Sequence, residues 1–107
     1  MMAKKRPSNF KTENEYQAKV IKKLKDIYGE NNVNKIPGSV RQGIPDIEVT
    51  CGPKYARLEA KAYEDAEHQP NQDYYVNYTN EQGAFARFIY PENEERVLSD
   101  LSDYFNK

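Results

Sequence analysis

The chain has 107 residues and a formal net charge of −1, with 31% charged and 37% hydrophobic residues. This length fits one domain and is too short for two. A single cysteine excludes an internal disulfide framework, and no apolar run approaches the length of a membrane span or a signal peptide core, so we expect a cytoplasmic protein without membrane contacts.

Basic residues are concentrated in the first third of the chain. Residues 1–35 carry nine Lys and Arg against four Asp and Glu, whereas residues 63–107 carry three against ten. A nucleic-acid footprint depends on where cations cluster more than on the total charge. The amino-terminal third is therefore the candidate surface for nucleic acid. Within it, residues 1–11 are expected to be a flexible basic lead, and residues 12–107 to form the domain.

A helix is expected over residues 12–28. Its apolar stripe is spaced for a helix, and a glycine at position 29 is placed to end it. Four lysines lie mostly off that stripe, where they either contact a nucleic-acid backbone or keep the helix soluble. The stripe consists of Tyr16, Val20, Leu24 and Ile27, and the lysines are Lys19, Lys22, Lys23 and Lys25.

A short strand is expected over residues 34–40, and it leads into a turn that contains Gly43. Arg41 and Gln42 lie in this turn, just before the strand that follows. They are candidates for contact with a phosphate backbone, although a polar surface turn is the default interpretation of such residues.

Residues 45–51 and 55–62 predict a β-hairpin, with Gly52 and Pro53 as the turn. Side chains alternate along a strand, so the apolar sets of both strands can pack inward while the charged sets share the opposite face. The inward set is Ile47, Val49, Cys51, Ala56, Leu58, Ala60 and Ala62.

With this turn, antiparallel pairing places Asp46 opposite Glu59. Opposed like charges destabilise a sheet by about 0.2–1 kcal/mol, and a divalent cation would compensate, since Mg²⁺ binds one or two protein carboxylates. Lys61, two residues beyond Glu59 on the same face, would hold a positive charge beside a scissile phosphate or an attacking hydroxide. The alternative is an ordinary solvated face, on which Arg57 and Lys61 screen the acids.

A second helix is expected over residues 70–82, because Pro suits its first turn and Gly83 suits its end. Gln72 shares a face with later residues of this helix and can point toward the two carboxylates, or it is simply a polar residue of the first turn. Three tyrosines of this helix are expected to pack with their hydroxyls at the surface. They are Tyr74, Tyr75 and Tyr78.

The rest of the chain predicts a strand over residues 84–90, buried on both faces, and a final helix over residues 92–105 with acids at its positive end. His68, the only histidine, lies in the acidic loop before the second helix and is expected to be incidental rather than a general base. The order helix, strand, hairpin, helix, strand, helix predicts an α/β domain with a mixed sheet.

The hairpin carries a two-part motif: Pro45 and Asp46, a spacer, and then Glu59, Ala60 and Lys61. This motif resembles the signature of the PD-(D/E)xK nuclease superfamily. More narrowly, the chain is similar to small phage and bacterial VRR-NUC and Holliday junction resolvase-like nucleases, from its first helix to the strand before its last helix.

The resemblance covers residues 15–90 and implies a restriction-endonuclease-like core. In that core helices flank a mixed central sheet in the order αβββαβ, here followed by a C-terminal helix. The implied metal ligands are Glu15, Asp46, Glu59 and the Ala60 carbonyl, and the implied catalytic residues are Asp46, Glu59, Lys61 and Gln72.

Glu15 has two competing roles. With Thr12 it matches a capping box, in which the glutamate bonds back to the Thr12 backbone and stays exposed. The resemblance instead directs its carboxylate toward Asp46 and Glu59, and this is the role we expect. Glu13 takes that role if the helix is rotated.

These residues predict a Mg²⁺-dependent DNA endonuclease that uses one or two cations and accepts Mn²⁺ as a substitute. A short chain without a further recognition domain favours structure-selective cutting, for example of branched DNA. The resembled family often pairs two active sites, so a homodimer is expected, in the cytoplasm of a host bacterium if a phage encodes it. The alternative is a catalytically inactive nucleic-acid-binding or assembly module with the same fold, and metal-dependent cleavage distinguishes the two.

Overall fold

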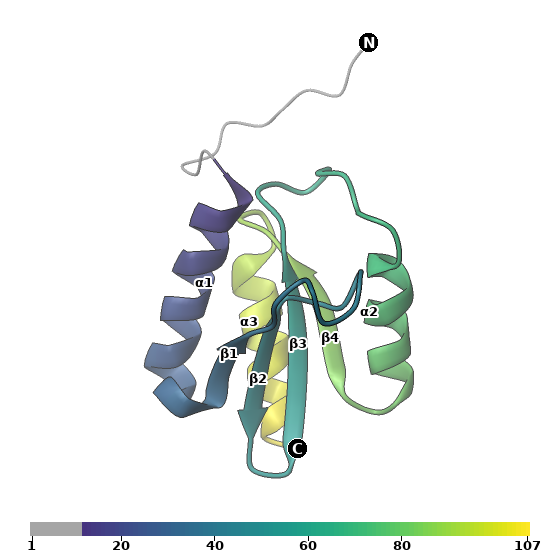
Figure 1. Ribbon diagram of the computed structural model, residues 1–107. Helices are drawn as coiled ribbons and strands as arrows, with labels where there is room; N and C mark the ends of the chain where they lie inside the picture. Colours follow the sequence, from purple (N-terminus) through teal and green to yellow (C-terminus); the bar gives the residue numbers. More distant parts are fainter. Residues whose placement is uncertain (1–11) are drawn as a thin grey trace.

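In a computed structural model the described residues are 12–107, so the predicted flexible lead lies outside them. They form three helices, one 3₁₀ turn and four strands in the expected order of an α/β domain (Figure 1). No helix in this part of the chain is long and apolar enough to cross a membrane. The elements are α1 (Glu13–Tyr28), η1 (Glu30–Asn32), β1 (Val33–Lys35), β2 (Ile47–Cys51), β3 (Lys54–Ala60), α2 (Gln72–Glu81), β4 (Phe85–Ile89) and α3 (Glu94–Phe105).

The strands form one mixed sheet in the order β1-β2-β3-β4. The first three strands pair antiparallel, and β4 pairs parallel with β3. In the β2–β3 hairpin Ile47 pairs with Leu58, which confirms the expected register. Asp46 and Glu59 follow at the next position of the same register, at one end of the sheet.

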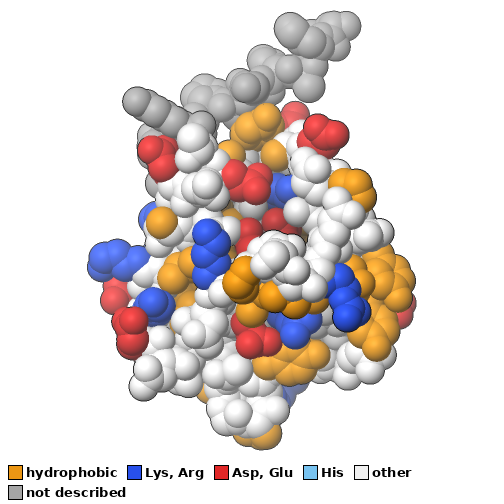
Figure 2. Space-filling model, in the orientation of Figure 1, with side chains coloured by type: hydrophobic (Ala, Val, Ile, Leu, Met, Phe, Trp, Pro, Cys, Tyr) orange, Lys and Arg blue, Asp and Glu red, His pale blue; other side chains and the backbone are white. Residues whose placement is uncertain are grey.

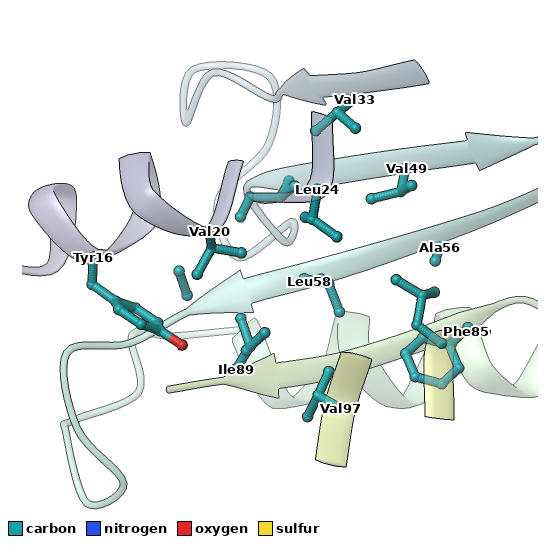
Figure 3. Close-up of a cluster of buried hydrophobic side chains, with 13 residues drawn as sticks. Tyr16, Val20, Leu24, Val33, Val49, Ala56, Leu58, Phe85, Ile89 and Val97 are labelled. Atoms are coloured by element: carbon teal, nitrogen blue, oxygen red, sulfur yellow. The ribbon is translucent and has the colours of Figure 1, made fainter. Parts of the chain in front are cut away.

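Helices cover both faces of the sheet. α1 and α3 pack on one face, and their apolar side chains meet those of the strands in a single core (Figure 3). α2 lies against β3 and β4 on the other face, because its Gln72 contacts Glu59, which alternates with the core residues of β3. The core residues are Tyr16, Val20, Leu24, Val33, Ile47, Val49, Ala56, Leu58, Ala60, Phe85, Ile89, Val97 and Leu101.

α1 begins with the capping box that its sequence predicts. The Thr12 hydroxyl accepts a hydrogen bond from the Glu15 N–H at 3.1 Å, and the Thr12 N–H donates to the Glu15 carboxylate at 3.4 Å. Gly29 ends the helix with a φ of +105°, a conformation that glycine adopts without steric cost. The orientation of α1 about its axis is set between these two ends by its buried stripe.

The last turn of α1 packs differently from the prediction. Ile27, which helical spacing places on the apolar stripe, is 56% exposed. Tyr28 packs instead, and its ring meets the ring of Phe105 edge-on with 5.2 Å between centroids. The larger aromatic side chain reaches α3 and closes this end of the core.

The prediction of a strand over residues 34–40 is wrong beyond Lys35, because β1 ends at that residue. Residues 36–46 form a loop with two backbone turns, closed by the N–H groups of Val40 and Ile44. A proline and a glycine near the middle of the expected strand prevent its ladder from continuing. This loop runs in front of the sheet toward α2 (Figure 1).

Several side chains that were expected to be buried are partly accessible. Cys51 is only half-buried at the end of β2, and Arg87 and Phe88 of β4 are half-buried as well. Tyr74 and Tyr78 of α2 are 59% and 45% exposed, and their rings stack on each other with 6.0 Å between centroids. These two tyrosines face solvent because they lie opposite the side of α2 that packs on the sheet.

A buried cluster around Glu94 ties α1 to α3. The Tyr16 hydroxyl donates to Glu94 Oε1 at 2.9 Å, and the ammonium groups of Lys19 and Lys23 lie 3.0 and 2.6 Å from Glu94 Oε2. Burial alone would raise the pKa of Glu94, but these donors outweigh it and lower the pKa. Lys19 and Lys23, predicted as nucleic-acid contacts, are therefore held by a carboxylate on α3.

We expect Glu94→Gln to lower the free energy of unfolding by about 2 kcal/mol, because hydrogen bonds to charged groups are worth about 1.5–3 kcal/mol each. Urea unfolding followed by circular dichroism measures this change. Glu95→Gln, at the exposed neighbouring position, is the matched control and should change the value by less than about 0.5 kcal/mol. Equal effects of the two substitutions would contradict a structural role for the cluster.

Candidate active site

An open cleft of about 520 Å³ lies where the amino-terminal half of α1, the loop of residues 36–46 and the start of α2 come together. Figure 2 shows acidic and basic atoms together in the hollow between α1 and the segment that follows β3. Five of the eleven predicted site residues line this cleft, namely Arg41, Gln42, Asp46, Glu59 and Gln72. The charged and amide side chains that line it include Glu13, Gln17, Lys35, Arg41, Asp46, Glu59 and Gln72.

The loop of residues 36–46 is fixed against α2 by a close backbone approach. Gly43 has a φ of +93°, and a Cβ at this position would lie 2.5 Å from the Cβ of Asn71. Any other side chain would push the loop away from the start of α2. Gly43 therefore holds the cleft in this shape, since the loop and the helix start form two of its walls.

Asp46 is held rigidly at the entrance to β2. Its carbonyl accepts a hydrogen bond from the Ile36 N–H at 2.7 Å, which extends the pairing of β1 with this segment. One carboxylate oxygen accepts from the Ala60 N–H at 3.4 Å, and the other accepts from the Gln17 side-chain amide. Burial raises the pKa of Asp46 to about 6, although these hydrogen bonds oppose the shift.

Glu59 is 3% exposed, so the alternative of a solvated sheet face is wrong for this residue. Its carboxylate accepts a hydrogen bond from Gln72 Nε2 at 3.1 Å, which confirms that Gln72 points inward. Burial, and then the adjacent Asp46 charge, raise the pKa of Glu59 to about 8, against the opposing charge of Lys61. The two acids therefore resist simultaneous ionisation unless a positive charge joins them.

Lys61 is also buried, with 2% exposure, immediately after β3. Its backbone N–H donates to the Ile89 carbonyl at 2.8 Å, so the sheet fixes its position. Its ammonium group donates to the Glu67 carbonyl at 3.0 Å and lies 3.9 Å from Glu13 Oε1. A buried cation is thus anchored next to the buried Glu59 and the partly buried Asp46.

Glu13, and not Glu15, is the α1 acid that lines the cleft. Glu15 is exposed and completes the capping box with Thr12. The two glutamates are separated by about 200° around the helix, so only one of them can face Asp46 and Glu59. Glu13, the residue predicted for a rotated helix, is therefore the α1 acid placed to take the ligand role that was expected for Glu15.

Gln17 is a site residue that the sequence prediction missed. It is buried, lines the cleft and donates to Asp46, one helical turn after Glu13. Each of the two acids thus has its own glutamine donor, Gln17 for Asp46 and Gln72 for Glu59. A polar residue at a position that helical spacing places beside the buried stripe was the available signal.

Of the five side chains predicted to contact nucleic acid, only Arg41 and Gln42 line the cleft. Lys22 is exposed on α1 and does not line the cleft, and its ammonium group is 3.6 Å from the Asp26 carboxylate. His68 pairs with Asp73 at 2.9 Å, and its ring stacks on Phe88, so these contacts account for its position. Lys19 and Lys23 contact Glu94, as described above.

The carboxylate oxygens at the cleft suit a hard cation, although they are few. Carboxylate oxygens are the ligands that Mg²⁺ prefers, and Mg²⁺ commonly takes only one or two of them from the protein. Asp46 and Glu59 supply such a pair, and Glu13 is close enough for its charge to raise the pKa of both. Across residues 12–107, however, no three His, Cys, Asp or Glu side chains are already grouped as a metal site. The role of the Ala60 carbonyl as a further metal ligand stays a prediction.

Comparison with known proteins does not show a family for this chain. No family model matches the sequence, and no curated protein is significantly similar to it.

Proposed function

We propose that this protein is a Mg²⁺-dependent endonuclease that hydrolyses DNA phosphodiester bonds. One observation carries the proposal: Asp46 and Glu59 lie side by side and largely buried at an open cleft, with the buried Lys61 next to them. Two neighbouring carboxylates with raised pKa values are costly for a purely structural domain, and such groups are typical of functional sites.

The fold supports this proposal without deciding it. A mixed sheet with β1 to β3 antiparallel and β4 parallel to β3, in the element order observed here, is compatible with a restriction-endonuclease-like core. The motif residues lie together at one end of the sheet, as a PD-(D/E)xK site requires. We therefore extend the proposal to this fold type, and we also propose the cytoplasmic location that the sequence predicts.

Asp46 and Glu59 would hold the cation, with Glu13 as the third acid. A bound Mg²⁺ would supply a polarised water and offset the charge that develops on the phosphate. Gln17 and Gln72 orient the two carboxylates through their amide groups. Lys61 places a fixed positive charge at the same end of the sheet, where an anionic group would gain from it.

The proposal is tested by incubating the purified protein with labelled linear duplex, single-stranded and four-way junction DNA. Each substrate is given Mg²⁺, Mn²⁺ or EDTA. We expect internal cleavage with either metal and none with EDTA, and stronger cleavage of the junction if the enzyme is structure-selective. Gel filtration in the same buffers tests the proposed homodimer. Binding of DNA without cleavage under every condition would instead favour the inactive binding module.

A further inference from the structure

Two cations at the cleft have no acidic partner within residues 12–107. Lys35 and Arg41 both line the cleft and are exposed, and among the described residues neither of them forms an ion pair. The lysines of α1 differ in this respect, since each has a carboxylate nearby: Lys19 and Lys23 have Glu94, Lys22 has Asp26, and Lys25 has Glu30. The free charges of this region are therefore at the cleft and not on the surface of α1.

The backbone fixes the places from which these two side chains extend. Lys35 ends β1 and pairs with Ile47, and the next residue donates its N–H to the Asp46 carbonyl. Arg41 lies further along the same loop, at the turn that its carbonyl closes with the Ile44 N–H. The cleft therefore has acids at its base and, in its walls, two cations that are unpaired within the described part of the chain. This separation of charge suits a phosphate chain bound together with a metal ion.

Lys35 also belongs to a second hollow of about 540 Å³ on the adjoining side of α1. Asn14 and Gln17 line both hollows as well, so the two hollows adjoin each other at these three residues. Lys22 and Lys25 lie along the second hollow, and their ion pairs are of the exposed kind that contributes about 0–1 kcal/mol. A polyanion that leaves the cleft past Lys35 thus meets further lysines.

We propose that Lys35 and Arg41 bind the phosphates on either side of the scissile bond, and that the nucleic-acid strand leaves the cleft past Lys35 along α1. This inference rests on the proposed function, because that function places the scissile bond at Asp46 and Glu59. It assigns Lys35, which the sequence did not single out. It also removes Lys19 and Lys23 from the binding surface, because Glu94 holds them on the α3 side of α1.

The test is the salt dependence of DNA binding, measured by fluorescence anisotropy in EDTA with labelled single-stranded and duplex oligonucleotides. Each lost phosphate contact lowers the slope of log K against log salt by about 0.7–0.9, which at 0.1 M salt is about a five- to eightfold loss of affinity. We expect this change for Lys35→Ala and for Arg41→Ala with the more tightly bound oligonucleotide. Arg96→Ala removes an exposed cation of α3 outside the cleft and should leave the slope unchanged.

An unchanged slope in Lys35→Ala or Arg41→Ala, or a change of equal size in Arg96→Ala, would overturn the inference. The result is independent of the proposed activity. If cleavage fails but the slopes change as expected, the phosphate contacts stand and the nuclease proposal falls. If cleavage is observed and the slopes do not change, the nuclease proposal stands and the phosphate contacts fall.

Discussion

Glu59→Gln is expected to raise the melting temperature of the metal-free protein at pH 8 and to abolish its metal-dependent cleavage. The pKa of Glu59 is raised from 4.5 to about 8, first by burial and then by Asp46, whose own pKa is raised from 3.8 to about 6. A raised pKa means that the folded state binds the proton more tightly than the unfolded state. The contribution of these two protonated carboxyl groups to the free energy of unfolding is therefore complete below about pH 4. It is lost as the pH rises through about 6, for Asp46, and then about 8, for Glu59.

Gln has the shape of a protonated glutamate and cannot ionise, so the variant avoids this loss. One pKa unit corresponds to about 1.4 kcal/mol, so a gain of at least about 1 kcal/mol is expected at pH 8. Thermal melts between pH 4 and pH 9 in EDTA measure it. Glu48→Gln is the control, because Glu48 lies on the same sheet face and pairs with Arg57, and its replacement should bring no such gain. A lower melting temperature for Glu59→Gln than for wild type at pH 8 would contradict the prediction.

The same variant tests the metal site directly. A ligand that binds only the folded state adds about 2.7 kcal/mol of stability at 100 times its dissociation constant. Mg²⁺ should therefore raise the melting temperature of the wild-type protein at pH 8, and this increment should disappear in Glu59→Gln together with at least about 99% of the cleavage rate. Equal stabilisation of both proteins by Mg²⁺ would exclude Glu59 as a ligand.

The hairpin was predictable because two local signals agree. The turn fixes the register, and the alternation of apolar and polar residues fixes which face is buried, since a slip by one residue would expose the whole apolar set. Pairing of Ile47 with Leu58 then places Asp46 beside Glu59 without further information. The direction of Gln72 was left open by the sequence, and the structure shows it pointing inward to Glu59.

The partners of the α1 side chains were not predictable, because they depend on distant parts of the chain. The carboxylate that holds Lys19 and Lys23 comes from α3, more than 70 residues later in the sequence. The choice between Glu13 and Glu15 depends on how α1 is rotated over the sheet. That rotation is set by the buried stripe together with the hydrogen bond of Tyr16 to Glu94, and no local pattern reveals this partner on α3.

The loop of residues 36–46 shows how a local pattern can mislead when it competes with tertiary structure. Hydrophobic residues around a Pro-Gly pair predict an interrupted strand over residues 34–40, but the ladder ends at Lys35. The chain instead turns across the sheet until Gly43 meets Asn71. This detour forms a wall of the cleft and brings Arg41 to it, so the departure from regular structure coincides with the candidate site.

Lys61→Met is expected to lower the cleavage rate by about 100-fold or more while the protein stays folded. Methionine fills nearly the same volume as the lysine stem, so the buried position should tolerate it. The substitution leaves the Glu67 carbonyl and the Glu13 carboxylate without the lysine. Both can be hydrated, because Glu67 is exposed and Glu13 is partly exposed. What is lost is the only cation buried beside Asp46 and Glu59 in the described part of the chain, and removing one preorganised charge of this kind typically costs 10²- to 10³-fold in rate.

Single-turnover cleavage and calorimetric Mg²⁺ binding separate the possible roles of Lys61. If it acts on the reacting groups, the rate falls much further than the change in metal affinity explains. If it acts only by favouring ionised Glu59, whose pKa it lowers, then raising the pH from 7 to 9 should restore cleavage in Lys61→Met. Lys54→Met removes a lysine from the other end of β3, where it contacts the end of α3, and should leave the rate unchanged. Cleavage by Lys61→Met within threefold of wild type at pH 7 would show that the buried ammonium group has a structural role, and the assignment of the catalytic lysine would then be wrong.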